Sequence, residues 1–167
     1  MIRPETAADI DAIAEVNRLA FGGPDEAVLV DRLRTDGDVI ASLVAEDDGA
    51  VVGHILFSPL YIEGAPVRVN AVALAPMCVR PEWQREGIGS ALVKRGLARC
   101  RERGMEAVFV LGHPEFYPRF GFRTDLAARL KAPFSGPAFM ALELKPRSLD
   151  LSDGRVHYAR AFGLESG

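Results

Sequence analysis

The residues of this chain that most clearly indicate a binding site are a glutamine and two glycines, which lie between an apolar run and a helical run. In Gln84-x-x-Gly87-x-Gly89 the glycines lack Cβ atoms, so another group can approach the backbone closely. The flanking residues predict a strand that ends near Pro81 and a helix that begins near Gly87. Free backbone N–H groups at a helix start attract anions, so this stretch predicts a pocket for a phosphate group.

Two common phosphate-binding loops do not match these residues. The P-loop requires Gly-x-x-x-x-Gly-Lys followed by Ser or Thr, and no stretch of the chain supplies it. The dinucleotide fingerprint requires a third glycine at the position of Leu92. A third type, the pyrophosphate loop of acetyl-CoA enzymes, fits the residues that are present.

The elements that must position this loop predict an α/β domain with a mixed sheet. Asp47-Asp48-Gly49 is a strong hairpin signal between two β-rich runs. Pro76 interrupts a long apolar run; because it removes a hydrogen-bond donor, it indicates a bulge or a splayed position. The expected strands are 2–4, 39–46, 50–60, 67–79, 107–111 and 138–144, with room for another at 155–158; the expected helices are 10–21, 24–36 and 87–104.

Composition limits the classes of function. The 167 residues predict one domain over 1–167, with 49% hydrophobic and 26% charged residues. A net charge of −3 argues against nucleic acid as a partner. Two cysteines and three histidines show no metal-ligand spacing. We find neither a signal pattern nor an apolar segment long enough for a membrane span, so we expect a cytoplasmic protein without a metal or a membrane partner.

The loop resembles the signature motif of the GNAT superfamily of N-acetyltransferases when its surroundings are included. The lead-in Val79-Arg80-Pro81, the helix after the loop, and Tyr117-Pro-Arg-Phe-Gly121-Phe122 all match that family. The resemblance covers residues 2–145 and leaves 146–167 as a C-terminal extension. Residues 113–122 further resemble a subgroup of small bacterial predicted acetyltransferases. The implied fold is a mixed, mostly antiparallel central sheet flanked by helices, with the pyrophosphate loop between a central strand and the following helix.

The resemblance also implies the co-substrate, acetyl-CoA, and the residues that hold it. Backbone N–H groups of the loop would cradle the pyrophosphate. The strand before the loop would pair with pantetheine, and one of its N–H groups could stabilise the oxyanion of the tetrahedral intermediate. The residues implied in binding acetyl-CoA are Met77, Cys78, Val79, Gln84, Arg85, Glu86, Gly87, Ile88, Gly89 and Ser90.

Tyr117 is the implied catalytic residue, facing the thiolate leaving group. With reference pKa values of ~10 for tyrosine and ~8.5 for a thiol, full proton transfer is uphill by roughly 2 kcal/mol. A strong hydrogen bond to the developing thiolate therefore matters more than complete transfer. The alternative is a core aromatic residue in the cluster 116–122. Many family members place an asparagine seven residues earlier, but here that position is Val110, so no asparagine contact is carried over.

The general base is left open by the sequence. Many family members use a glutamate on a central strand, but residues 67–79 contain no Asp or Glu. His54 is the nearest titratable candidate, and the alternatives are a structural histidine, a water or no base at all. Cys78 could accept the acetyl group covalently, although a small core residue and direct transfer are the simpler interpretation.

The resulting hypothesis is an acetyl-CoA-dependent N-acetyltransferase that acts on a primary amine of a small molecule or peptide by direct attack. The alternatives are a non-catalytic acyl-CoA-binding or sensing module, and an acyltransferase that uses a longer acyl chain. The first two helices and the segments 58–66 and 131–137 are expected to line the acceptor site. A homodimer is compatible with the family.

Overall fold

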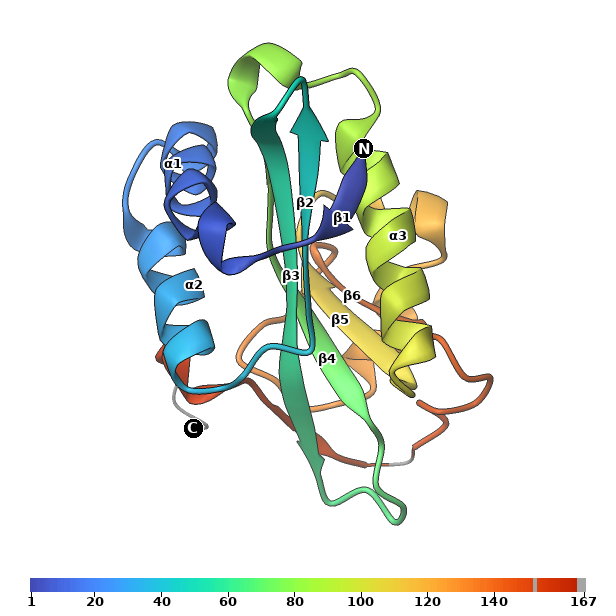
Figure 1. The fold of residues 1–167 in the computed structure, drawn as a ribbon. Coiled ribbons are helices and arrows are strands. Elements are labelled where there is room, and N and C mark those ends of the chain that lie inside the picture. Colours follow the sequence, from blue (N-terminus) through green and yellow to red (C-terminus); the bar gives the residue numbers. More distant parts are fainter. Residues whose placement is uncertain (152, 165–167) are drawn as a thin grey trace.

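A twisted sheet separates two layers of helices in the computed structural model, which describes residues 1–151 and 153–164 (Figure 1). The strand order is β1-β2-β3-β4-β5-β6, and β7 pairs with β3. Among these pairs β4–β5 is parallel and the others are antiparallel. The strands are β1 (Ile2–Pro4), β2 (Ala41–Asp47), β3 (Ala50–Glu63), β4 (Ala71–Val79), β5 (Ala107–Leu111), β6 (Phe139–Glu143) and β7 (Arg155–His157).

The helices cover both faces of this sheet. Helices α1 (Ile10–Phe21) and α2 (Asp25–Thr35) lie on one face, and α3 (Ile88–Glu102) lies on the other. The short α4 (Thr124–Ala128) contacts β6 at the sheet edge. Single 3₁₀ turns occur at Ala7–Asp9, Pro81–Trp83, Tyr117–Phe120 and Arg160–Phe162. None of the helices within the described ranges has the length and apolar character of a membrane span.

The predicted mixed sheet is therefore confirmed, although several strand ends were wrong. The expected strand 50–60 continues to Glu63, because residues 61–63 pair with β7. The expected strand 67–79 begins only at Ala71, because residues 66–70 turn away from the sheet and Val67 is 73% exposed. The backbone N–H of Asn70 instead donates to a carboxylate oxygen of Glu106 (2.9 Å), which fixes the chain just before β4. The further strand expected near 155–158 is present as β7 (Arg155–His157).

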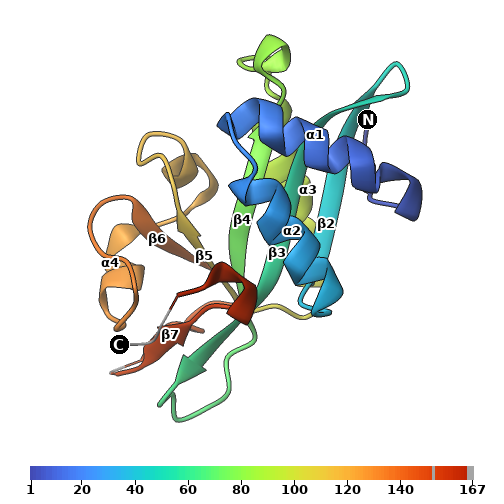
Figure 2. The ribbon, with the colours of Figure 1, turned by 90° about the vertical axis from the view of Figure 1, so that its left-hand side faces the viewer.

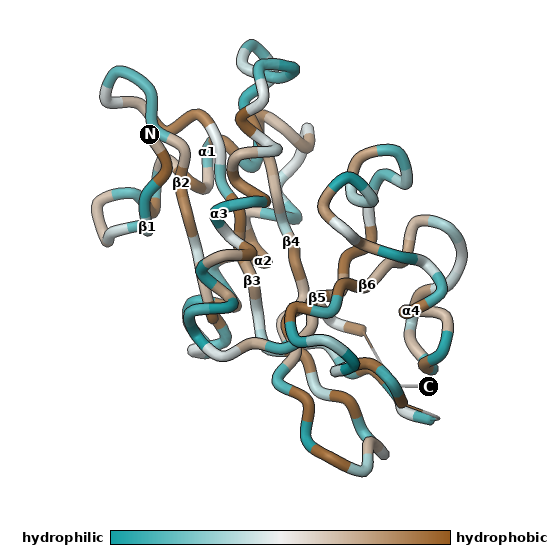
Figure 3. Tube along the Cα trace, turned by 90° about the vertical axis from the view of Figure 1, so that its right-hand side faces the viewer, coloured by the Kyte–Doolittle hydropathy of each residue, from teal (hydrophilic) through white to brown (hydrophobic). Residues whose placement is uncertain are grey.

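The sheet is apolar on both faces because helices cover both. Along β3 the side chains alternate: Ile55 and Phe57 join the cluster under α3, whereas Leu56 joins the cluster under α1 and α2. Figure 3 shows the resulting hydrophobic runs along the central strands and hydrophilic residues in most of the connecting loops. A strand buried on both faces reads as a continuous apolar run, as the sequence of β3 does.

Strands β4 and β5 pair at one end only. Ala71–Ala73 pair with Ala107–Phe109, and beyond this point the two strands diverge (Figure 2). A bulge lies in the diverging part of β4. Leu74 pairs with Phe57 and Met77 pairs with Ile55, so β4 has one more residue than β3 over this interval, which includes Pro76. The bulge and splay expected at Pro76 are confirmed. The open edge of β4 from residue 74 to 79 thus borders a gap in the sheet.

Helix α3 approaches the sheet closely because Gly96 faces β3. A Cβ atom at Gly96 would lie 2.3 Å from Cε1 and 2.7 Å from Cζ of Phe57, which is fully buried. No side chain fits there without a shift of the helix or of the ring. This contact sets the distance of α3, and hence of its N-terminus, from the sheet.

We expect Gly96→Ala to lower the free energy of unfolding by about 1–3 kcal/mol, despite alanine's higher helix propensity, because overpacking against Phe57 outweighs it. Urea denaturation followed by circular dichroism measures the change. Lys94→Ala, on the exposed face of the same helix, is the control and should change stability by less than about 0.5 kcal/mol. A stabilised Gly96→Ala protein would show that α3 does not depend on this close approach.

Candidate active site

A cavity of about 820 Å³ lies where β4 and β5 diverge. The end of α1 borders it through Ala20 and Phe21, and the segment after β5 borders it through His113, Glu115 and Phe116. Most of the residues that the sequence implicates in cofactor binding line this cavity: Met77, Cys78, Val79, Gln84, Arg85, Gly87, Gly89 and Ser90. The structure thus brings the strand end, the glycine loop and the helix start together around one space.

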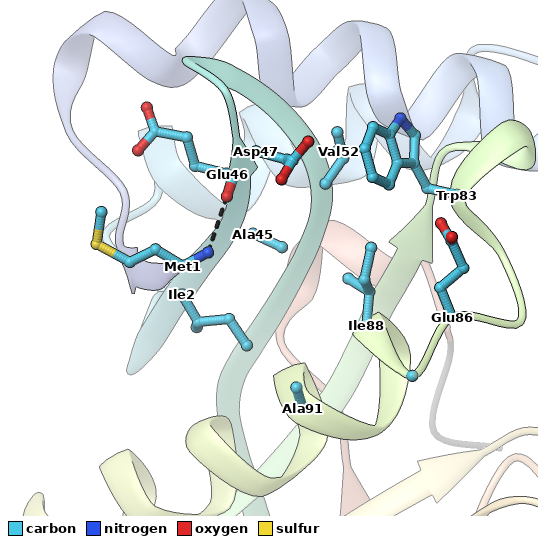
Figure 4. Close-up of a pocket in the computed structure, with 11 residues that line it drawn as sticks. Met1, Ile2, Ala45, Glu46, Asp47, Val52, Trp83, Glu86, Ile88 and Ala91 are labelled. Carbon is cyan, nitrogen blue, oxygen red and sulfur yellow. Dashed lines mark hydrogen bonds between the residues drawn. The ribbon is translucent and has the colours of Figure 1, made fainter.

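Two residues of the predicted set face elsewhere. Glu86 and Ile88 line a separate hollow of about 360 Å³, together with Ile2 and Val52. Figure 4 shows these side chains around the smaller hollow together with Trp83, a residue that lines both spaces. Neither Glu86 nor Ile88 lines the larger cavity, so their predicted role in binding the cofactor stays a prediction.

The loop conformation exposes backbone N–H groups at the start of α3. Arg85 and Gly87 both have positive φ, +68° and +82°, and such turns form concave anion sites. The Gln84 side chain donates a hydrogen bond to the Val79 carbonyl (3.0 Å), which ties the loop to the end of β4. No side chain caps α3, and its first turn contains no acidic residue. The positive end of this helix dipole is thus available to an anion.

Gly89 is not required by the packing of the protein itself. A Cβ atom at this position would lie 3.5 Å from Cε of Met77 and 3.8 Å from Cζ of Phe116, which are ordinary contacts. The residue lines the cavity, and an added methyl group would project toward these cavity-lining side chains. A glycine here is explained by a ligand that must approach the helix start closely.

The cavity also carries groups that the sequence interpretation missed. Arg119 is exposed and its guanidinium lies 5.8 Å from the centre of the Phe116 ring, so a second cation joins Arg85 at the rim. Trp83, the single tryptophan, also lines it. The aromatic segment 116–122 was the available signal for Phe116 and Arg119, but its turn geometry could not be read from the sequence.

Tyr117 lies directly behind the cavity wall rather than in it. Its ring packs edge-to-face against Phe116 and Phe122 and covers Gly112, where a Cβ would meet the ring at 2.4 Å. Burial raises the pKa of Tyr117 to about 12. Its hydroxyl has no hydrogen-bond partner among the described residues. The hydroxyl oxygen is not fully buried, so it keeps access to solvent. The catalytic role of Tyr117 stays a prediction.

The arrangement of loop, helix and split sheet agrees with the comparison against known families. The family described as Acetyltransferase (GNAT) domain matches residues 1–124. The chain belongs to the GNAT acetyltransferase family.

Relatives within this family cover nearly the whole chain. The N-acetyltransferase YhbS of Escherichia coli K12 is 36% identical over 97% of this chain and 98% of its own length. A crystal structure of E. coli YhbS in complex with CoA has a TM-score of 0.90 at 35% identity, covering 100% of this chain and 93% of that one. A GNAT acetyltransferase from Brucella melitensis, in complex with acetyl-CoA, has a TM-score of 0.82 at 36% identity, covering 97% of each chain.

His54 is placed as a structural residue of this GNAT fold. It is fully buried, its Nε2 lies 2.9 Å from Oγ of Ser42, and its Nδ1 lies 3.3 Å from Nδ2 of Asn17. Burial, and to a smaller extent the positive charge of Arg34, lower the pKa of His54 to about 3. The imidazole does not line the cavity, so it cannot reach a substrate amine there.

Cys78 lines the cavity but remains a neutral thiol. It is 4% exposed, and burial raises its pKa to about 12. The thiolate is the nucleophilic form of cysteine, and it is scarce at pH 7 for such a pKa. The geometry therefore gives no support to a covalent acetyl-cysteine route.

We expect His54 to make stability depend on pH. Because its pKa is lower in the folded protein than in the unfolded chain, the unfolded chain binds the extra proton first, so stability is lost as the pH falls below about 6.5. The slope between pH 6 and pH 4 should approach about 1.4 kcal/mol per pH unit from this residue alone. Urea denaturation at several pH values measures the slope.

His54→Gln should flatten this slope, whatever its effect on stability at pH 7. His113→Gln, at an exposed position, should leave the slope as in the wild type. An unchanged slope in His54→Gln would mean that the imidazole is protonated in the folded protein.

Proposed function

We propose that the protein transfers the acetyl group of acetyl-CoA to a primary amine of a small molecule or peptide by direct attack. The observation that carries this proposal is the continuity of one cavity from the uncapped start of α3 to the gap between β4 and β5. An anionic pyrophosphate and an extended pantetheine arm need such a pair of neighbouring sites. CoA and acetyl-CoA complexes of YhbS and of the Brucella relative support the same choice of donor.

The residues present fit this donor. Backbone N–H groups of Gly87, Gly89 and Ser90 would hold the pyrophosphate, and Arg85 and Arg119 would add positive charge at the rim. Beyond Ala73 the backbone of β4 no longer pairs with β5, so those N–H and C=O groups at 77–79 that point away from β3 can bond pantetheine amides in a strand-like manner, except the Val79 carbonyl, which accepts from Gln84.

Tyr117 acts in this proposal as a hydrogen-bond donor to the leaving sulfur. Amine attack on the thioester carbonyl carbon forms the C–N bond and breaks the C–S bond, which leaves a thiolate. With a tyrosine pKa of about 12 and a thiol pKa of ~8.5, full proton transfer from Tyr117 would be uphill by about 5 kcal/mol. A phenol that stays protonated still stabilises the thiolate, and the amine can supply the proton that finally reaches sulfur.

A non-catalytic acyl-CoA sensor is the second candidate, because β4 carries no carboxylate that could serve as base. Both candidates bind acetyl-CoA, so thiol release separates them. Incubation with acetyl-CoA and a panel of primary amines releases CoA-SH only from an acetyltransferase.

Substitutions at Gly89 test the donor site. We expect Gly89→Ala to fold with unchanged or slightly higher stability, by up to ~1 kcal/mol, yet to bind CoA at least about tenfold more weakly. Gly89→Glu should abolish detectable binding, because it adds bulk and negative charge where the pyrophosphate lies. Quenching of Trp83 fluorescence during CoA titration measures binding.

Ala98→Glu is the control for the added charge, since residue 98 lies on the exposed face of the same helix. It should bind CoA as the wild type does. Normal binding by Gly89→Glu would refute the assignment of the loop.

Tyr117→Phe tests the leaving-group contact. We expect kcat to fall by about 100-fold, because a donor to developing negative charge is worth this much, with acetyl-CoA binding unchanged. Thiol release with an accepted amine measures kcat. Tyr61→Phe, whose side chain is 62% exposed, is the matched control. Undiminished turnover by Tyr117→Phe would make Tyr117 a core aromatic residue only.

A further inference from the structure

Arg119 is a cation that the protein itself leaves unpaired at the rim of the cavity between β4 and β5. The residue is exposed and lines that cavity. Its side chain has no carboxylate or hydrogen-bond partner among the described residues, and its contact is with the ring of Phe116, whose centre lies 5.8 Å from Cζ of the guanidinium. The N–H groups of this guanidinium are therefore available to a ligand.

The turn that carries Arg119 is held in place by aromatic packing. The rings of Tyr117 and Phe120 both meet the Phe116 ring edge-to-face, with ring centres 5.0 and 5.2 Å from it. The backbone N–H of Arg119 donates to the Phe116 carbonyl (3.3 Å), and the attraction between a cation and an aromatic ring holds the side chain nearby. A position that is set before a ligand arrives lowers the entropic cost of binding.

Phe116 also relates Arg119 to the start of α3. The Cζ atom of this ring lies 3.8 Å from the position that a Cβ atom at Gly89 would take. The guanidinium and the helix start therefore border the same phenyl ring. Two groups that attract anions, one a side chain and the other the backbone, are thus neighbours in one cavity.

CoA carries two separate anionic groups in a matching arrangement. Its pyrophosphate is assigned above to the start of α3. Its third phosphate is a monoester on the 3′ carbon of the ribose, and such a group has a charge near −2 at pH 7. A single sugar ring separates the two anions of the ligand, and a single phenyl ring borders the two groups of the protein.

The other polar residues that line the cavity are less suited to this phosphate. The Gln84 side chain donates to the Val79 carbonyl (3.0 Å), and Arg85 belongs to the turn that leads into the pyrophosphate site. Glu115, the single carboxylate among the described lining residues, would repel a phosphate. The imidazole of His113 has at most two donors, whereas a guanidinium binds a phosphate through two parallel N–H···O bonds.

We propose that Arg119 is a specificity-determining residue that binds the 3′-phosphate of the donor, so that the protein selects thioesters of CoA over those of dephospho-CoA. The proposal rests on the acetyl transfer proposed above. The 3′-phosphate lies at the opposite end of the donor from the thioester, so Arg119 acts on donor binding and not on the chemical step. Loss of this contact should raise KM for acetyl-CoA and leave kcat unchanged.

Titration of the whole protein with CoA and with dephospho-CoA, followed by Trp83 fluorescence, tests the proposal. We expect the wild type to bind CoA about tenfold more tightly than dephospho-CoA, and Arg119→Gln to bind the two alike. Arg119→Lys should keep part of the preference, because it retains the charge but loses the paired N–H bonds. Added salt should reduce the wild-type preference, because an exposed ion pair is screened.

A pair of isomers separates the position of the phosphate from the total charge. Adenosine 3′,5′-bisphosphate and ADP contain the same atoms, but only the first carries a 3′-phosphate. In competition with CoA, Arg119→Gln should weaken binding of the first by about tenfold and leave binding of ADP unchanged. Equal losses for both isomers would show that Arg119 acts only as a general positive charge, which would overturn the proposal.

Arg101→Gln, the same change at an exposed position near the far end of α3, is the control and should bind every ligand as the wild type does. Equal binding of CoA and dephospho-CoA by the wild type, or an undiminished preference in Arg119→Gln, would overturn the role of Arg119. So would a higher KM for the amine with an unchanged KM for acetyl-CoA, which would assign Arg119 to the acceptor. A protein that prefers CoA through Arg119 but releases no thiol would instead refute the acetyl transfer alone.

Discussion

The site depends on one constraint, the limited pairing between β4 and β5. These strands share a parallel ladder only from Ala71 to Ala73, and the extra residue at the bulge of β4 bends that strand away. A closed sheet would leave no passage between its faces. Because the sheet opens here, a cavity reaches from the α3 side, where Met77 and Gly89 lie, to the α1–α2 side, where Cys78 packs.

The electrostatics of the donor site come from the backbone. The start of α3 lacks both a side-chain cap and an acidic first turn, so its N–H groups remain unsatisfied within the protein. Gly96 lets the helix lie close to Phe57, and the Gln84 side chain ties the loop to Val79. Together these contacts hold the open helix end against the open strand edge. A phosphate group and an extended arm can therefore be bound at adjacent positions without any rearrangement of the sheet.

The sequence was sufficient for features that depend on local geometry. The Gln-x-x-Gly-x-Gly spacing, the hairpin at 47–49 and the disruptive Pro76 each specify their own backbone, and each prediction agrees with the structure. Tertiary packing decided what the sequence could not. Residues 67–70 have strand-like composition but lie in the irregular segment before β4, and Tyr117 is covered by its aromatic neighbours.

His54 shows how a polar group can matter to the site without reaching it. Asn17 donates to Nδ1, so Nε2 keeps the proton and donates to Ser42, whose hydroxyl donates to Glu5. Arg34 of α2 also pairs with Glu5. This chain of bonds joins α1, the sheet and α2 with a neutral imidazole at its centre. Since the end of α1 lines the cavity between β4 and β5, the network helps to fix where the α1–α2 layer meets the gap. A buried histidine that never changes its charge near pH 7 is well suited to that task, because the position of the layer then does not vary with pH.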